Sequence, residues 1–339
     1  MLARRLAISF GLFAGVLLSG FLLVPTTATA QTDNWVVPRT ADGQPDLQGV
    51  WLSNAATPLQ RLPALAERPH LTDEEVSTLQ GRANRIFENG RSAFTTPEGA
   101  FLAALENVET YEAWSTSSSI GMVDVTFTNR TSLVVDPPDG RIPALTRGAQ
   151  AREATVDDGW RFKTGPEDLS NIHRCITTGV PRLGGNFGAG PYTYYQIVQT
   201  PNHLVFISEA FHDARIIPLD GRPHLPDQIR QWNGDSRGYW DGDTLVVETR
   251  NFSPKSYYRG AAEGLYLVER FTRSGSDTLT YRLTLADPAT WASPWTAEVP
   301  LQLRDQAIYE FACHEGNVSI VGMLRTARLE DKRAVGNGR

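Results

Sequence analysis

The chain has 339 residues and a formal net charge of −6 at pH 7. This acidic balance excludes a broad basic surface of the kind that binds nucleic acid or an anionic membrane. Small molecules, glycans or other proteins remain as the expected classes of partner, and the length allows one large or two small domains.

The first thirty residues predict a secretory signal peptide. Arg4 and Arg5 precede a long apolar run, which ends in small residues at Ala30, as in signal peptides that are cleaved at such a site. We therefore expect cleavage after Ala30 and a mature chain in the periplasm or outside the cell, without membrane contact. An uncleaved anchor is the alternative, because the run approaches the ~20 residues of a spanning helix.

The only two cysteines, Cys175 and Cys313, would follow that leader into an oxidising compartment, where disulfides persist. We expect them to pair. In the chain-entropy model, closing a loop of this length stabilises the fold by up to about 4–5 kcal/mol. Two buried free thiols are the alternative, because two cysteines do not define a disulfide framework.

The predicted elements change from helices to strands along the chain. Residues 31–69 are rich in Pro, Gly and polar residues and predict an extended arm. Thr72 and Glu75 have the spacing of a capping box and begin a helix that ends near Gly90. A second helix is expected over residues 97–114.

Beyond residue 120, apolar and polar residues alternate between turn sequences, which indicates antiparallel strands with one buried face. The clearest alternation covers residues 277–286, and the last strand expected covers residues 307–313. A long meander must hide its edges. We predict a mainly β fold with N-terminal helices (α+β), in which an antiparallel meander curls into a lipocalin-like barrel or a strongly bent sheet.

These elements predict four consecutive parts of the chain. They are a signal peptide (1–30), an extended arm with two helices packed on the main domain (31–116), an antiparallel β domain (117–330) and a disordered tail (331–339).

Eight segments of the chain resemble a large family of functionally uncharacterised secreted bacterial proteins. They are PDLQGVW, TSLVVDPPDGRIP, YQIVQTP, HDARIIPLDGRPH, GDSRGYWDGDTLVVET, VERFTR, DPATWASPWTAEVPL and YEFACHEGN. The resemblance spans almost the whole mature chain and implies a single unit from about residue 35 to 328. It implies no reaction, cofactor or catalytic residue.

The stretch EAFHDARIIPLDGRPHLP, residues 209–226, concentrates titratable groups at an expected strand end. A metal site needs three or four converging ligands, typically His and carboxylate. The candidate ligands are Glu209, His212, His224 and His314. No short ligand motif accompanies them, so we expect no cofactor and leave a divalent metal open.

A second concentration of chemistry involves Glu269 and Glu310. Glu269 alternates with apolar residues and is either buried or paired with an arginine such as Arg215, Arg222 or Arg237. If Glu310 also faced inward, the two carboxylates would share one cavity, as acid–base cleavage of a glycosidic bond requires. The expected disulfide would also bring His173 close to His314.

The sequence therefore predicts an exported enzyme with a His/Glu/Arg-lined cleft at the barrel mouth, which performs hydrolysis or elimination on a small organic or sugar-like substrate. The expected catalytic residues are Glu269, His314, His212 and Glu310. The expected substrate-binding residues are Arg215, Arg222, His224, Trp240 and His173. The alternative is a non-catalytic calyx for a small apolar or aromatic ligand, and a scaffold whose charges only fix loops is a third hypothesis.

Overall fold

The structure, a computed structural model, describes residues 35–87, 97–108, 125–157, 165–177, 179–181, 193–256 and 258–336. The expected signal peptide lies outside these ranges. The fold described below belongs to the unit Val36–Arg339.

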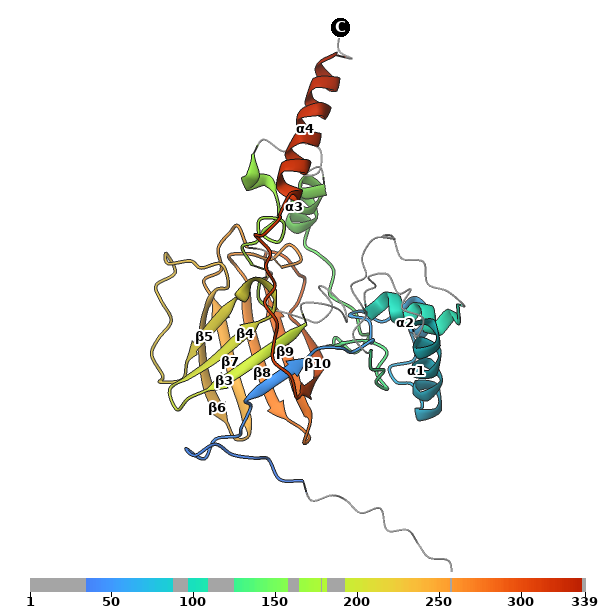
Figure 1. The fold of residues 1–339 in the computed structure, drawn as a ribbon, viewed down its shortest axis with the longest axis vertical. Helices are drawn as coiled ribbons and strands as arrows, with labels where there is room; N and C mark the ends of the chain where they lie inside the picture. The colour runs from blue at the N-terminus through green and yellow to red at the C-terminus, as the bar shows by residue number, and fades with distance from the viewer. Residues whose placement is uncertain are drawn as a thin grey trace, which may run out of the picture. The chain divides into compact units, whose positions relative to one another are not determined.

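The capping box predicted at the first helix is present. Helix α1 (Asp73–Phe87) begins where the Glu75 N–H donates to Thr72 Oγ1 at 3.2 Å and the Thr72 N–H donates to Glu75 Oε2 at 2.9 Å. Helix α2 (Pro97–Glu106) packs beside α1 (Figure 1). The two helices share a small apolar core, in which the Phe101 and Phe127 rings stack at 5.7 Å.

Ten strands form one antiparallel sheet. Their bounds are β1 (Gly49–Leu52), β2 (Val134–Asp136), β3 (Tyr194–Gln199), β4 (His203–Ser208), β5 (Ala214–Pro218), β6 (Asp235–Asp241), β7 (Thr244–Arg250), β8 (Tyr266–Arg273), β9 (Thr278–Ala286) and β10 (Trp295–Arg304). The order is β5-β4-β3-β1-β10-β9-β8-β7-β6, with β2 also paired to β10. Helices α3 (Arg147–Asp157) and α4 (Ser319–Gly336) complete the described α-helices.

The sheet consists of two meanders that a short N-terminal strand joins. Strands β3–β5 and β6–β10 each follow the chain through hairpins, and β1 pairs with β3 on one side and β10 on the other. The alternation predicted over residues 277–286 is confirmed: Leu279, Tyr281, Leu283 and Leu285 are all buried in the main core.

The sheet does not close into the expected lipocalin-like barrel, and the expected strong bend is not confirmed either. Strands β5 and β6 are the open ends of the sheet. Side chains fill the space between them, because Ile217 and Leu219 lie against Gly238 where a Cβ atom would clash. Strand β5 also ends at Pro218, which has no N–H to donate to a neighbouring strand.

Side chains nevertheless connect the two meanders across the interior. Phe206 of β4 packs on Phe271 of β8 with ring centroids 4.8 Å apart. Arg215 of β5 contacts Glu269 of β8. One continuous core therefore receives side chains from both meanders.

The strand expected over residues 307–313 is absent; this segment carries no regular secondary structure. Strand β10 offers it no free edge, because β9 pairs with one side of β10 while β1 and β2 pair with the other. Helix α4 follows and extends over residues 331–336 of the segment expected to be a tail. Within the described ranges, no helix combines the length and the apolar character that crossing a membrane requires.

The predicted disulfide is confirmed. Cys175 and Cys313 are bonded with their Cα atoms 5.7 Å apart, 138 residues apart in sequence. Asn317 reinforces the junction, since its Nδ2 donates to the His173 carbonyl at 2.9 Å and lies 3.2 Å from Cys175 Sγ. The bond thus ties the segment before α4 to the loop that precedes β3.

Replacing both cysteines by serine should lower the free energy of unfolding by about 2–5 kcal/mol, because the unfolded chain loses a long covalent loop. Urea unfolding of the wild type and of the Cys175→Ser, Cys313→Ser variant measures this difference. A reducing agent should destabilise the wild type and leave the variant unchanged. Equal stability of the two proteins would contradict the prediction.

Candidate functional site

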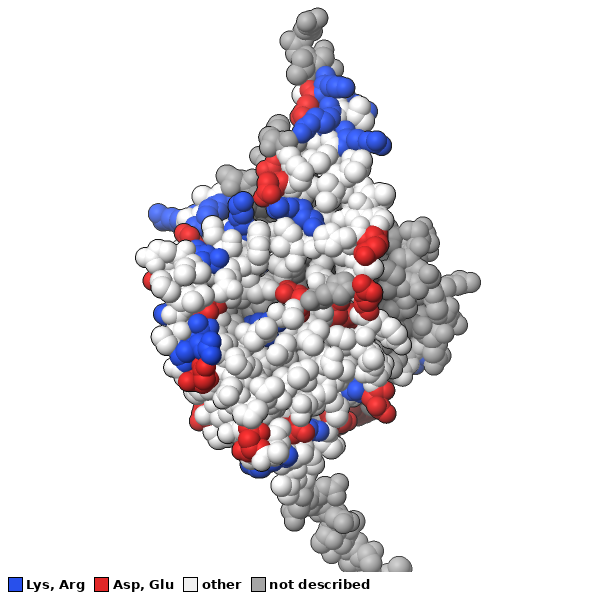
Figure 2. Space-filling view, turned by 60° about the vertical axis from the view of Figure 1, so that its left-hand side comes forward, with Lys and Arg blue, Asp and Glu red and all other residues white. Residues whose placement is uncertain are grey.

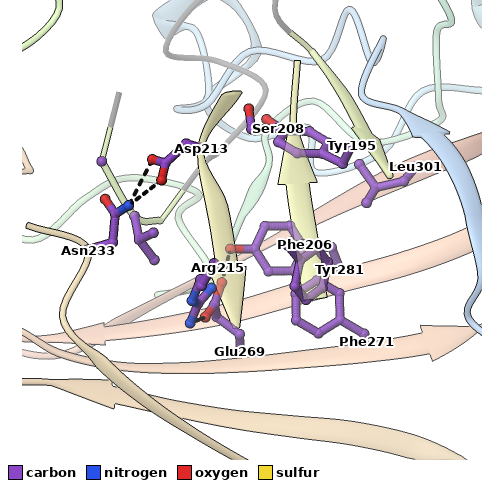
Figure 3. Close-up of a pocket in the computed structure, with 12 residues that line it drawn as sticks. Tyr195, Phe206, Ser208, Asp213, Arg215, Asn233, Glu269, Phe271, Tyr281 and Leu301 are labelled. Atoms are coloured by element: carbon purple, nitrogen blue, oxygen red, sulfur yellow. Dashed lines mark hydrogen bonds and ion pairs between the residues drawn. The ribbon is translucent and has the colours of Figure 1, made fainter. Parts of the chain in front are cut away.

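A cavity of about 60 Å³ lies between the two meanders, and Figure 3 shows the side chains around it. Its walls are mainly aromatic and apolar: the Phe271 ring stacks on Tyr281 with centroids 4.7 Å apart and packs at a tilt on Phe206 with centroids 4.8 Å apart. The lining residues are Gly179, Val180, Tyr195, Phe206, Ser208, Asp213, Arg215, Asn233, Glu269, Phe271, Tyr281 and Leu301.

A buried ion pair forms one side of this cavity. Arg215 Nη2 donates to Glu269 Oε2 at 2.5 Å, and the hydroxyl of Tyr281 donates to Glu269 Oε1 at 2.7 Å. Only 2% of the Glu269 side chain and 12% of the Arg215 side chain are exposed. Of the three arginines expected as partners of Glu269, Arg215 is therefore the one that pairs with it.

Two hydroxyl groups complete the shell of the ion pair. Arg215 Nε donates to Ser236 Oγ at 2.9 Å, and Arg215 Nη2 donates to Thr249 Oγ1 at 2.6 Å. Burial raises the pKa of Tyr281 well above 10, and the neighbouring Glu269 carboxylate raises it further. Tyr281 thus stays protonated and remains a donor to Glu269 at physiological pH.

A second polar cluster borders the cavity at the end of β4. Asn233 Nδ2 donates to both carboxylate oxygens of Asp213, at 2.9 and 2.7 Å, and the Thr177 hydroxyl donates to Asp213 Oδ2 at 2.6 Å. Two residues near this cluster, Cys175 and Phe211, adopt left-handed backbone conformations with φ of 55° and 61°. The disulfide at Cys175 thus fixes the loop that delivers Thr177 to Asp213.

A larger polar groove of about 540 Å³ shares Arg215 and Asn233 with the cavity. Four of its lining residues are arginines: Arg215, Arg222, Arg230 and Arg237. Arg222 Nε donates to the two oxygens of Asp220 at 2.8 and 2.9 Å, and Arg237 Nη1 donates to Asp235 at 2.6 Å. Figure 2 shows basic and acidic side chains side by side at several places on the surface, as this pairing leads one to expect.

Asp235 organises the side of this groove next to β6. Its carboxylate is 4% exposed, lies 2.8 Å from His224 Nδ1 and accepts the Leu225 N–H at 2.9 Å. An Nδ1–H donated to the carboxylate would leave Nε2 of His224 as the basic nitrogen. His224 thus has the orientation of an acid–base group next to the groove.

The structure brings together only part of the predicted site. Glu269 and Arg215 lie at the cavity, Arg222 lines the groove, and His224 binds Asp235. Trp240 is half-buried and packs on the main core. His173 Nδ1 lies 2.7 Å from Ser170 Oγ.

The other predicted residues are not gathered around the cavity. Glu310 and His314 are exposed on the segment between β10 and α4, so the expected pair of inward-facing carboxylates is wrong. The prediction failed because the strand expected over residues 307–313 is missing, and only that strand would have turned Glu310 inward. Glu209 is half-buried and does not line the cavity; its N–H donates to the Tyr194 carbonyl. The side chain of His212 lies outside the described residues.

Sequence reasoning missed several polar residues that line the two spaces or bond to their lining residues. They are Thr177, Asp213, Asn233, Asp235, Ser236, Thr249 and Tyr281. Tyr281 carried a usable signal, since it shares the apolar face of its strand and a buried hydroxyl needs a partner. Among the described residues, no three His, Cys, Asp or Glu side chains lie close enough to hold a metal.

Comparison of the chain with family models, curated proteins and solved structures finds no match.

Removing one partner of the buried ion pair should be far more damaging than removing both. Arg215→Met or Glu269→Leu alone should lower the free energy of unfolding by about 3–5 kcal/mol, because an unpaired charge stays buried. The double variant should lose much less than the sum of the two. Urea unfolding of the four proteins measures the coupling.

The pair between Arg130 and Glu298 supplies the control for this cycle. Its atoms approach to 2.7 Å, but 37% and 21% of the side chains are exposed. Arg130→Met should therefore cost at most about 1 kcal/mol. Additive losses at Arg215 and Glu269 would contradict the burial argument.

Ionisation of Tyr281 should destabilise the fold in alkali. Its folded pKa lies above its unfolded value near 10, so its contribution is complete below pH 10 and is lost as the pH rises further. Tyr258 and Tyr266, whose pKa values burial raises to about 12, act in the same direction. Tyr281→Phe should make the decline above pH 10 shallower by up to about 1.4 kcal/mol per pH unit.

Unfolding curves at a series of pH values test this prediction. At neutral pH, Tyr281→Phe should lose about 1–3 kcal/mol, because Glu269 loses a buried donor. Tyr309→Phe is the control, since Tyr309 is 75% exposed. Identical alkaline slopes for the wild type and Tyr281→Phe would rule out the role given to Tyr281.

Proposed function

We propose that this chain is an exported small-molecule binding protein, whose cavity takes the apolar or aromatic end of an organic ligand. The observation that carries the proposal is the cavity itself, an aromatic space bounded by a buried ion pair in which both Glu269 oxygens accept hydrogen bonds. Ligand sites are typically apolar spaces with a few placed polar groups. A formed disulfide supports export to the periplasm or beyond, where such bonds persist.

The hydrogen bonds that the Glu269 carboxylate already accepts favour ligand binding over catalysis at this cavity. Both of its carboxylate oxygens already accept hydrogen bonds, from Arg215 and Tyr281. A general base needs an oxygen within hydrogen-bond reach of the proton that it removes. Glu269 therefore serves better as a fixed wall than as an acid or base.

The size of the cavity limits the part of the ligand that it holds. Sites for whole drug-sized molecules typically have about 300–1,000 Å³, and this cavity has about 60 Å³. A short branched chain or part of one ring is the expected occupant, because cavities that hold a whole benzene ring have about 150 Å³, and the remainder of the ligand lies outside the cavity.

An acid–base enzyme is the second candidate, and the contact between His224 and Asp235 is the observation that favours it. A carboxylate at Nδ1 orients an imidazole for proton transfer through Nε2. This candidate keeps hydrolysis or elimination of a small organic or sugar-like substrate and moves its centre from Glu269 to His224. If this candidate is right, His224→Asn should keep the melting temperature of the wild type and lose turnover.

Titration of the wild type with benzyl alcohol, followed by NMR, should give saturable binding. Leu301→Phe should abolish this binding, because Leu301 is 4% exposed and lines the cavity that the larger ring would fill. Val299→Ile is the matched control on the same strand, since Val299 is buried but does not line the cavity. Absence of binding to the wild type, or equal binding to both variants, would overturn the proposal.

A further inference from the structure

We infer that the arginine-lined groove binds an oxyanion group, carboxylate or phosphate, of the ligand whose apolar end occupies the cavity. The inference rests on the proposed function and names the class of ligand: an amphipathic organic anion. Arg215 and Asn233 line both spaces, so the groove and the cavity are neighbours. A ligand bound at Arg215 would place its polar end in the groove and its apolar end in the cavity.

Each arginine of the groove keeps donor capacity that the protein does not use. Arg215 donates through Nε and Nη2, and Arg222 also donates through Nε and Nη2. Arg230 donates only through Nη1, and Arg237 donates through Nε and Nη1. Within the described ranges, one terminal nitrogen of each guanidinium thus lacks a hydrogen-bond partner. None of these four nitrogens is buried.

Among the described residues, the groove keeps one unneutralised positive charge, because Glu269, Asp220 and Asp235 pair with three of its arginines and leave Arg230. Asp235 is the one acidic residue of the described lining, and it is already bonded to His224, Arg237 and the Leu225 N–H. Arg230 bonds only to the carbonyls of Phe252 and Glu263, so no described carboxylate neutralises it. Planar guanidinium groups bind carboxylate and phosphate through paired N–H donors.

The volumes fit a ligand that is mostly polar. The groove, at about 540 Å³, lies within the range of whole-ligand sites, whereas the cavity accepts only a small group. Trp232 lines the groove and offers an indole N–H as a spectroscopic reporter. An anion bound there should therefore perturb the Trp232 signal, while a neutral ring confined to the cavity should not.

The experiment compares benzyl alcohol, phenylacetate and phenyl phosphate as probes, with acetate as the anion that lacks a ring. Wild type should bind at least one ring-bearing anion about tenfold or more tightly than benzyl alcohol. The double variant Arg222→Gln, Arg230→Gln should remove this advantage and leave benzyl alcohol binding unchanged. It spares Arg215 and Arg237, whose loss would leave the buried Glu269 and Asp235 carboxylates without their arginines.

Arg270→Gln is the matched control, because Arg270 forms an exposed pair with Asp241 at 2.7 Å and does not line the groove. Its affinity for the anions should equal that of the wild type, and added salt should weaken only the anionic probes. Stronger binding of phenyl phosphate than of phenylacetate would identify phosphate as the group recognised, and the reverse would identify carboxylate.

The outcomes separate this inference from the proposed function. Equal affinities for neutral and anionic probes, or equal losses in Arg270→Gln and the double variant, would overturn the groove inference and leave the cavity proposal standing. Arginine-dependent binding of the anions, acetate included, without binding of benzyl alcohol would support the groove and overturn the cavity proposal. Binding of none of the probes would overturn both.

Discussion

The buried contact between Arg215 and Glu269 is the interaction on which the arrangement of the sheet depends. Strands β5 and β8 are far apart in the strand order, and β5 is an open edge. The ion pair nevertheless joins them at 2.5 Å with little exposure to water. Because separating buried charges costs several kcal/mol, this contact holds the β3–β5 meander against the β6–β10 meander and preserves the cavity between them.

Features that depend on neighbours in the sequence could be predicted. The capping box at Thr72 and Glu75 and the alternation that buries Tyr281 both follow from local spacing. Alternation along β8 likewise predicted that Glu269 is either buried or paired with an arginine, and it is both. The cysteine pair followed from the exported context and the absence of any third cysteine.

Features that depend on partners far along the chain could not be predicted. Strand β1 has four residues in a Pro- and Gly-rich segment, yet it pairs in the middle of the sheet. Because β1 and β2 cover one side of β10 and β9 covers the other, residues 307–313 find no free edge on β10, and Glu310 stays exposed. A pattern of alternating residues indicates a strand but carries no information on which edges are free.

The charged stretch 209–226 divides into separate pairings once the chain is folded. Asp213 accepts from Asn233 and Thr177, while Arg222 binds Asp220 within one turn. Arg215 reaches into the core, and His224 turns to Asp235. Titratable groups are dense in this stretch because some of them fix loops and others pair in the core. The groove borders both sets.

Arg215 is common to the fold, the cavity and the groove, and this restricts how a ligand can use it. Its Nη2 holds Glu269 and Thr249, and its Nε holds Ser236, so only Nη1 remains for a ligand. A ligand that competed for Nη2 would strand the Glu269 carboxylate in the core. Binding through Nη1 keeps the ion pair intact, and the guanidinium is already fixed by the fold. Little side-chain entropy is then lost on binding, which favours affinity from few contacts.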